Sequence, residues 1–169
     1  MRPLLACAIA ATLSLLALNA QQIAPSTDPP PSARVVLEAK GDGVQIYTCS
    51  TAPDGLKWVF KAPDAKLLDA SGKVIGSHFA GPTWKLTDGG EIQGELIASK
   101  PAPAADSVPW LLLHAKPGTA VGSMAGVEFI RRTATHGGVA PASGCGSSAD
   151  AGKTQEAAYT ATYTFYTRP

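Results

Sequence analysis

The sequence predicts an all-β fold, a single β-sandwich or barrel of about nine strands held by one disulfide. Most apolar residues fall in short runs that alternate with polar residues, which is the pattern of half-buried strands. Glycine, proline and aspartate separate these runs and act as turn residues. After the leader, no long segment repeats its apolar residues at helical spacing.

Residues 1–20 are predicted to form a signal peptide. Arg2 supplies the positive charge, residues 4–18 are almost wholly apolar, and Ala20 ends a patch of small residues. We therefore expect cleavage after Ala20 and a secreted or periplasmic protein. The apolar run is shorter than the ~20 residues that cross a bilayer, and no later run compares with it, so we expect no membrane span.

The remaining chain is expected to divide into a spacer and one domain. Residues 21–33 are rich in proline and poor in apolar residues, which predicts a disordered spacer. Residues 34–169 are expected to form a single all-β domain. Of the 14 basic residues, Arg2 is lost with the leader, which leaves 13 basic against 13 acidic residues. This balance offers no basic patch for nucleic acid, so we expect no nucleic-acid partner.

Two cysteines, Cys49 and Cys145, remain once the leader with Cys7 is removed. An even number of cysteines in an exported chain predicts a disulfide between them. The bond would close a loop of about 95 residues and contribute about 4 to 5 kcal/mol in the chain-entropy model. A catalytic thiol pair is the alternative, although the two cysteines do not form a C-x-x-C motif.

The first half of the domain is expected to begin with strands at residues 35–39 and 44–50. A Gly-Asp-Gly sequence at residues 41–43 predicts a hairpin turn between them. The next strand, residues 56–61, alternates apolar and polar side chains after an Asp-Gly turn. Residues 62–68 are compatible with either a short helix or a further strand.

The central part of the domain is expected to contain a corner followed by a β-hairpin. Strands are predicted at residues 74–79, 83–87 and 91–99. The Gly-Pro pair at 81–82 ends the strand at residues 74–79, because proline has no N–H for the strand ladder. The Asp-Gly-Gly sequence at 88–90 supplies the positive φ that a tight hairpin turn requires.

Three further strands are expected at residues 109–113, 127–135 and 157–167. The first is an unbroken apolar run, which is typical of a strand covered on both faces. The last places its aromatic residues on alternate positions, and therefore mostly on one face. Between the last two, residues 136–156 form a long irregular segment, and segments of this length are usually functional or disordered.

Six stretches of the chain resemble a known protein family. They are GVQIYTCS, LKWVFKAPDAKL, GSHFAGPTWKLTDGGEIQGE, VPWLLLHA, EFIRRTATHGGVAP and YTATYTFY, and they span nearly all of residues 34–166. On these stretches the chain resembles the exported family of bacteria and fungi catalogued as domain of unknown function 3455. The resemblance implies export and a disulfide, and it implies no activity.

His78 and Trp84 lie on either side of the Gly-Pro corner, so the two rings are expected to approach each other across it. In the structural interpretation, Trp84 belongs to the core and His78 hydrogen-bonds to the backbone. In the functional interpretation, both rings line a ligand site. Trp58 and Trp110 have apolar surroundings and are expected in the core.

Arg131 and Arg132 are neighbours in an expected strand, so one of the two side chains faces the interior. An inward arginine needs a carboxylate or carbonyl partner, because an unpaired buried charge is very costly. One hypothesis places this arginine and His78 in a polar pocket beneath residues 136–156. The alternative is a structural ion pair inside the domain.

The sequence holds no complete catalytic or nucleotide-binding motif, so we expect no cofactor and no assigned catalytic residue. The favoured function is a non-enzymatic exported β-domain that binds a small molecule, a glycan or a partner protein. The candidate ligand-binding residues are His78, Trp84, Asp88, Arg132 and His136. The alternative is a metal-dependent or hydrolytic enzyme that uses His78, Asp88 and His136, although no two histidines have the spacing of a metal-binding pair.

Overall fold

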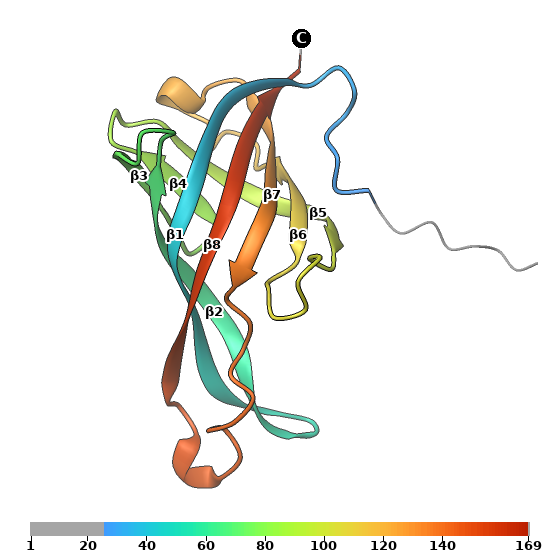
Figure 1. The fold of residues 1–169 in the computed structure, drawn as a ribbon, viewed down its shortest axis with the longest axis vertical. Coiled ribbons are helices and arrows are strands. Elements are labelled where there is room, and N and C mark those ends of the chain that lie inside the picture. Colours follow the sequence, from blue (N-terminus) through green and yellow to red (C-terminus); the bar gives the residue numbers. More distant parts are fainter. Residues whose placement is uncertain (1–25, 169) are drawn as a thin grey trace, which may run out of the picture.

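The computed structural model describes residues 26–168, so the expected signal peptide lies outside the described residues. Within this range, eight strands pair antiparallel in sequence order, and the last pairs with the first to close a barrel (Figure 1). The strands are β1 (Arg34–Ala52), β2 (Gly55–Leu68), β3 (Val74–Phe79), β4 (Thr83–Leu86), β5 (Glu91–Lys100), β6 (Trp110–Ala115), β7 (Val127–Gly137) and β8 (Thr154–Thr167). Two short 3-10 turns accompany them, η1 (Gly122–Met124) and η2 (Ser148–Asp150).

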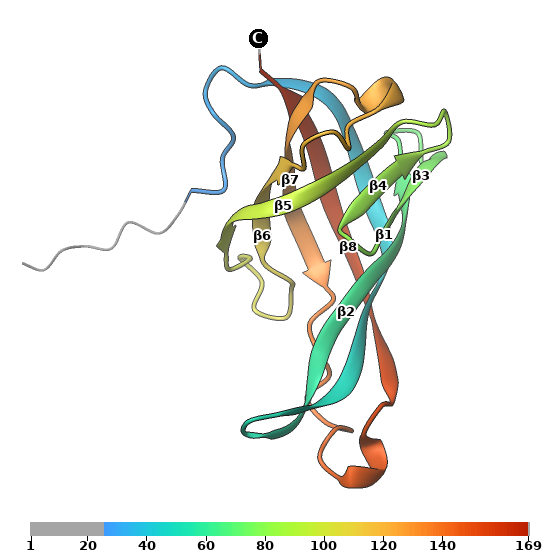
Figure 2. The same ribbon diagram turned by 180° about the vertical axis from the view of Figure 1, so that it is seen from behind.

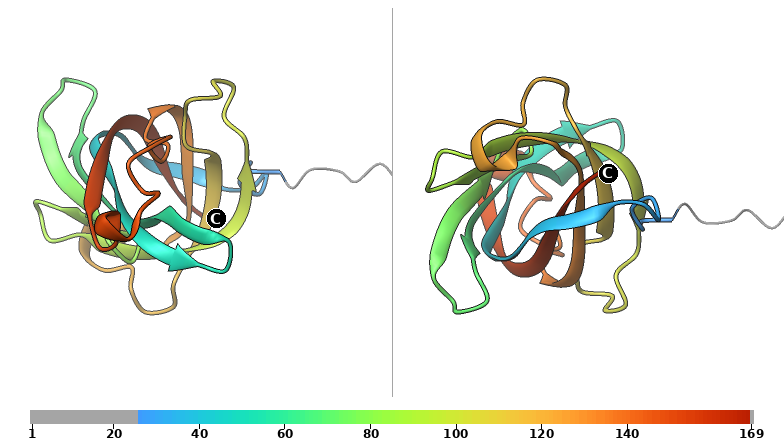
Figure 3. Two further views of the ribbon diagram at one scale, coloured as in Figure 1. Left: turned by 90° about the horizontal axis from the view of Figure 1, so that it is seen from below. Right: turned by 90° about the horizontal axis from the view of Figure 1, so that it is seen from above.

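This architecture confirms the all-β prediction and is a barrel rather than a sandwich. Seen along the long axis of the molecule, the strands encircle one interior (Figure 3). The strand count is one lower than expected, because β1 unites the first two predicted strands. No helix within residues 26–168 is both long enough and apolar enough to cross a membrane.

The hairpin turn expected at residues 41–43 is wrong, because β1 runs through these residues without a break. A Cβ atom at Gly43 would lie 2.1 Å from the carbonyl oxygen of Asp64 on β2. A Cβ atom at Gly41 would lie 2.6 Å from Cε2 of the Tyr163 ring. The two glycines therefore allow a close approach of neighbouring groups, and the chain does not change direction there.

Gly43→Ala is expected to lower the free energy of unfolding by about 1 to 3 kcal/mol, because the added methyl group must displace backbone atoms of β2. Gly146→Ala is the matched control. A Cβ at Gly146 meets nothing within 4 Å, so this variant should differ from the parent protein by less than about 0.5 kcal/mol. Urea denaturation measures both values, and equal stability of the two variants would contradict the close approach at Gly43.

The expected corner and hairpin of the central region are confirmed. β3 and β4 pair across the Gly-Pro turn, where Gly81 has a φ of 124°. β4 and β5 pair across the Asp-Gly-Gly turn, where Gly89 has a φ of 91°. Glycine adopts these angles without the steric cost that other residues meet.

The undecided segment 62–68 is the second half of β2, and it borders an incomplete part of the barrel wall. β2 pairs with β1 along its length but with β3 only from Ala65 to Leu68. Beside residues 55–64 of β2, no strand of the described chain pairs on the second edge. β1, β2 and β8 continue past the other strands as a narrow arm (Figures 1 and 2).

The predicted disulfide joins Cys49 of β1 to Cys145, with 5.5 Å between the two Cα atoms. It ties the segment between β7 and β8 to the arm. Two hydrogen bonds support this attachment: Trp58 Nε1 donates to the Ser143 carbonyl at 2.8 Å, and the Tyr47 hydroxyl donates to the Gly138 carbonyl at 2.6 Å. A disulfide is typical of proteins outside the reducing cytosol.

The chain before β1 contacts the outer surface of the barrel. Thr27 is fully buried, and Asp28 forms an ion pair with Arg131 of β7. Through these contacts Thr27 and Asp28 lie against the barrel. The disordered spacer expected over residues 21–33 stays a prediction. Residues 21–25 of that spacer lie outside the described range.

Candidate functional site

A cavity of about 200 Å³ reaches into the barrel interior beside β2. Its exposed rim includes Phe60 and Lys61 of β2 and Ala80 and Gly81 of the β3–β4 turn. Its buried wall comes from strands on several sides of the barrel and comprises Gln45, Pro63, His78, Trp84, Leu113, Arg132 and Tyr163. The cavity lies where β2 and β3 stop pairing, so the incomplete wall gives access to it.

The cavity has an aromatic wall built on the β3–β4 register, which places His78 opposite Trp84. The two rings stack, with centroids 4.4 Å apart and an interplanar angle of 8°. The Tyr163 ring meets both edge-on, at 4.9 Å from His78 and 5.5 Å from Trp84. The predicted approach of His78 and Trp84 is confirmed, and so is the burial of Trp84, which is 1% exposed.

His78 is buried and hydrogen-bonded to the backbone, as the structural interpretation expects. Burial lowers the pKa of His78 to about 4, and the nearby positive charge of Arg132 acts in the same direction. The imidazole is therefore neutral at pH 7. Its Nδ1 lies 2.9 Å from the Thr83 carbonyl oxygen, which can only accept, so Nδ1 carries the proton and Nε2 is an acceptor.

Arg132 is the inward member of the arginine pair, and it is 9% exposed. Its Nε and Nη2 atoms donate to the Pro109 carbonyl at 3.1 and 2.8 Å. Arg131, on the opposite face of β7, pairs with Asp28 instead. The ion pairs among residues 26–168 do not include Arg132, and no acidic residue lines the cavity. The alternative of an internal ion pair is therefore wrong for Arg132, whose partner is a neutral carbonyl.

Two buried N–H groups in the cavity wall lack an acceptor. Gln45 and Trp84 are 2% and 1% exposed, and neither Gln45 Nε2 nor Trp84 Nε1 has an acceptor in the described part of the chain. A buried donor without an acceptor costs about 1 to 3 kcal/mol. The wall thus combines one guanidinium with two N–H groups that lack an acceptor.

Asp88, a further sequence-predicted site residue, is outside the cavity. It lies in the β4–β5 turn, where its carboxylate accepts hydrogen bonds from the Gly90 N–H at 2.9 Å and the Ser123 hydroxyl at 3.0 Å. These two hydrogen bonds lower the pKa of the carboxyl group. Asp88 therefore stabilises the hairpin turn and its contact with η1.

His136 also lies away from the cavity, on the exposed surface at the end of β7. A bulge between Thr133 and His136 shifts the pairing of β7 with β8, and Ala134 within it has a φ of 46°. The hypothesis that residues 136–156 cover the pocket is wrong, because none of them lines it. The rim is made by β2 and the β3–β4 turn instead.

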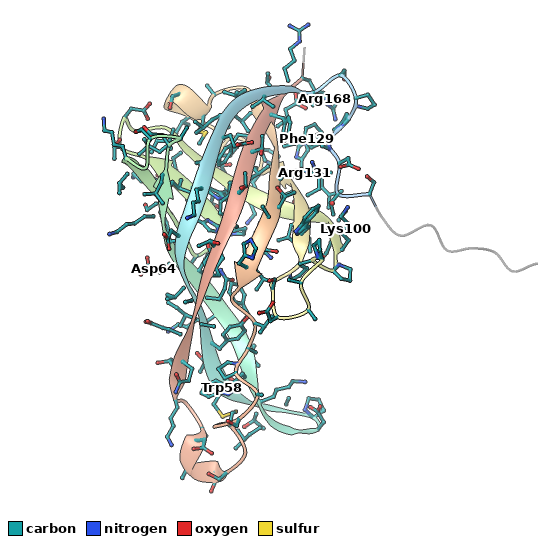
Figure 4. The ribbon with its side chains drawn as sticks, viewed as in Figure 1. Trp58, Asp64, Lys100, Phe129, Arg131 and Arg168 are labelled. Atoms are coloured by element: carbon teal, nitrogen blue, oxygen red, sulfur yellow. A yellow bond between two sulfur atoms is a disulfide. The ribbon has the colours of Figure 1, made fainter. Side chains whose placement is uncertain are left out.

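Trp58 and Trp110 are only partly buried, so their expected place in the core is wrong. Trp58 lies on the arm (Figure 4), where the segment carrying Cys145 covers it. Trp110 lies under Lys100, whose Nζ is 4.9 Å from the ring centroid. Of the three tryptophans, Trp84 alone lines the cavity.

Gln45 and Tyr163 line the cavity as well, although the sequence pattern does not identify them as site residues. The turn expected at residues 41–43 separates Gln45 from the strand before it. Without the continuous strand, the pattern does not show whether the Gln45 side chain points inward or outward. Tyr163 was visible in the alternation of residues 157–167, where it shares a face with Tyr159 and Phe165. That pattern identified a buried ring without identifying the cavity beside it.

Comparison with known proteins identifies one family. The model of the family described as "Protein of unknown function (DUF3455)" matches residues 29–167. The chain belongs to this family. The match covers all eight strands and every residue of the cavity wall, so the site lies within the DUF3455 domain. No curated protein and no solved structure matches the chain.

Proposed function

We propose that this DUF3455 protein is an exported binding domain that holds one small organic molecule in the barrel cavity. The observation that carries the proposal is the cavity of about 200 Å³ between the incomplete wall beside β2 and the His78–Trp84 stack. An engineered cavity of about 150 Å³ in another protein binds benzene, so this volume suits a molecule with about one ring. Eight-stranded barrels are wide enough to hold one small ligand.

Export is part of the proposal. The leader-like composition of residues 1–20 and the disulfide between Cys49 and Cys145 both support a secreted or periplasmic location. A binding domain in such a compartment meets small molecules that enter from the environment.

A binding role is favoured over the alternative of a metal-dependent or hydrolytic enzyme. That enzyme needs His78, Asp88 and His136 at one place, whereas Asp88 serves a turn and His136 is on the outer surface. Within residues 26–168, no three histidine, cysteine or acidic side chains converge in a metal-binding group. The cavity instead combines apolar and aromatic walls with a few polar groups, as small-molecule sites do.

Titration of ¹⁵N-labelled protein with benzoate and with benzamide tests the binding role. At least one of these single-ring probes should bind with a dissociation constant below about 1 mM. The indole N–H signal of Trp84 should shift, while the signals of Trp58 and Trp110 stay in place, because only Trp84 lines the cavity. No saturable shift with either probe, or equal shifts of all three indoles, would contradict the proposal.

A further inference from the structure

We propose that the natural ligand is a small monocarboxylic acid whose carboxylate is bound by Arg132 at the inner end of the cavity. The inference rests on the binding role proposed above and specifies its ligand class. Three properties of the described residues support it: the charge of the cavity, its two buried N–H groups without an acceptor, and its apolar side chains.

The charge of the cavity calls for an anion. The Arg132 guanidinium is buried, and its hydrogen-bond acceptor is the neutral Pro109 carbonyl. Burying a cation without an opposite charge close by is costly. The lining includes no aspartate or glutamate, and its second cation, Lys61, lies at the exposed rim. A bound carboxylate would supply the missing negative charge, and its planar shape matches the planar guanidinium fork.

The buried polar atoms also favour an acceptor-rich group. Gln45 Nε2 and Trp84 Nε1 are donors without acceptors in the described chain. An ionised carboxylate has only acceptor sites, about four lone pairs on two oxygens. It can therefore satisfy several donors at once, which a neutral alcohol or amide cannot do without bringing further donors.

The size of the positive charge favours a carboxylate over a phosphate ester. His78 is neutral at pH 7, because its burial and the nearby Arg132 lower its pKa to about 4. The interior of the cavity thus holds a single positive charge, from Arg132. A carboxylate carries one negative charge, whereas a phosphate monoester carries about −1.5 to −2. One guanidinium neutralises the charge of a carboxylate. It would leave part of the charge of a phosphate monoester without compensation in a buried site.

The rest of the cavity fits an apolar body. Leu111 and Leu113 of β6 line it, and Phe60 stands half-exposed at the rim. An acid with a single aromatic ring or a short branched chain would place its apolar part against these side chains. Its carboxylate would then lie at the inner end.

Calorimetric titration at pH 7 with benzoate, benzamide and phenyl phosphate tests this inference. Benzoate should bind the unmodified protein at least about tenfold more tightly than benzamide, a neutral molecule of the same shape. Arg132→Gln should remove this preference, and Arg131→Gln should keep it, since Arg131 faces outward to Asp28. If Arg132→Gln does not fold, the ratio of the two affinities in the unmodified protein decides the question alone.

The possible results separate the two proposals. Equal affinities for benzoate and benzamide, or a preference that survives in Arg132→Gln, would overturn the carboxylate assignment and leave the binding role intact. Tighter binding of phenyl phosphate than of benzoate would also overturn it, in favour of a phosphate ester. If no probe binds at all, the binding role itself fails.

Discussion

Cys49→Ser is expected to lower the free energy of unfolding by about 4 to 5 kcal/mol. The bond between Cys49 and Cys145 closes a loop across a sequence separation of 96, and a cross-link of this span removes much of the conformational entropy of the unfolded chain. For a domain of this size, the loss corresponds to a fall of about 10 °C or more in melting temperature. Differential scanning calorimetry of the oxidised protein, without reductant, measures the melting temperature.

Two further variants distinguish the stabilising effect of the disulfide from that of the packing of the two cysteine side chains. Cys145→Ser and the double variant should both lose as much stability as Cys49→Ser, because each lacks the same cross-link. Cys49 is buried, with 1% of its surface exposed, and Cys145 is partly exposed, so effects of local packing would differ between the single variants. If the losses in the single variants add up in the double variant, the stabilising effect does not come from the disulfide.

Acidification from pH 7 to pH 4 is expected to cost about 3 kcal/mol of stability through His78 alone. The pKa of His78 in the folded protein is about 4, below the usual 6.5. Between these values the unfolded chain binds more protons at this residue than the folded chain does, so stability falls as the pH falls. The contribution is fully present above about pH 6.5 and is lost towards pH 4. Urea denaturation at several pH values measures the slope.

His78→Asn isolates this contribution. The asparagine amide can still donate to the Thr83 carbonyl but does not titrate, so the slope between pH 4 and 6.5 should flatten. His136→Gln, at an exposed position, is the control and should leave the slope unchanged. Hydrogen bonds also lower the pKa of the Asp54, Asp69, Asp88 and Asp150 carboxyls, and their contribution is lost mainly below about pH 4, so it is common to all three proteins and cancels in the comparison. A full slope in His78→Asn would refute the assignment to His78.

Local patterns in the sequence predicted the features that depend on neighbouring residues. The Gly-Pro and Asp-Gly-Gly turns required positive φ or a break in pairing, and both turns are present. The alternation of side chains placed one of two adjacent arginines inside, and Arg132 is the inward one. The pairing of the two cysteines followed from their number. Each of these inferences rests on backbone sterics, strand periodicity or counting.

The sequence pattern predicts the wrong role for the glycines at residues 41 and 43. A Gly-Asp-Gly sequence can form a turn, or it can let a neighbouring strand or ring come close to the backbone. Which of the two occurs depends on the groups packed against the glycines. Here Asp64 and Tyr163 stand opposite, and neither is near Gly41 or Gly43 in sequence. Asp88 and His136 were misplaced for a related reason, since a turn and a bulge direct them away from the interior.

The sequence by itself determined that this is a disulfide-bonded all-β protein with a histidine and a tryptophan on either side of a corner and one arginine facing inward. The tertiary structure alone decided that the sheet closes into a barrel and that β2 separates from β3 to leave a cavity. It also decided that Arg132 faces this cavity without an acidic partner. The physical reason is range: periodicity and turn chemistry act over a few residues, whereas the closure of the sheet and the surroundings of a buried charge depend on strands far apart in the chain.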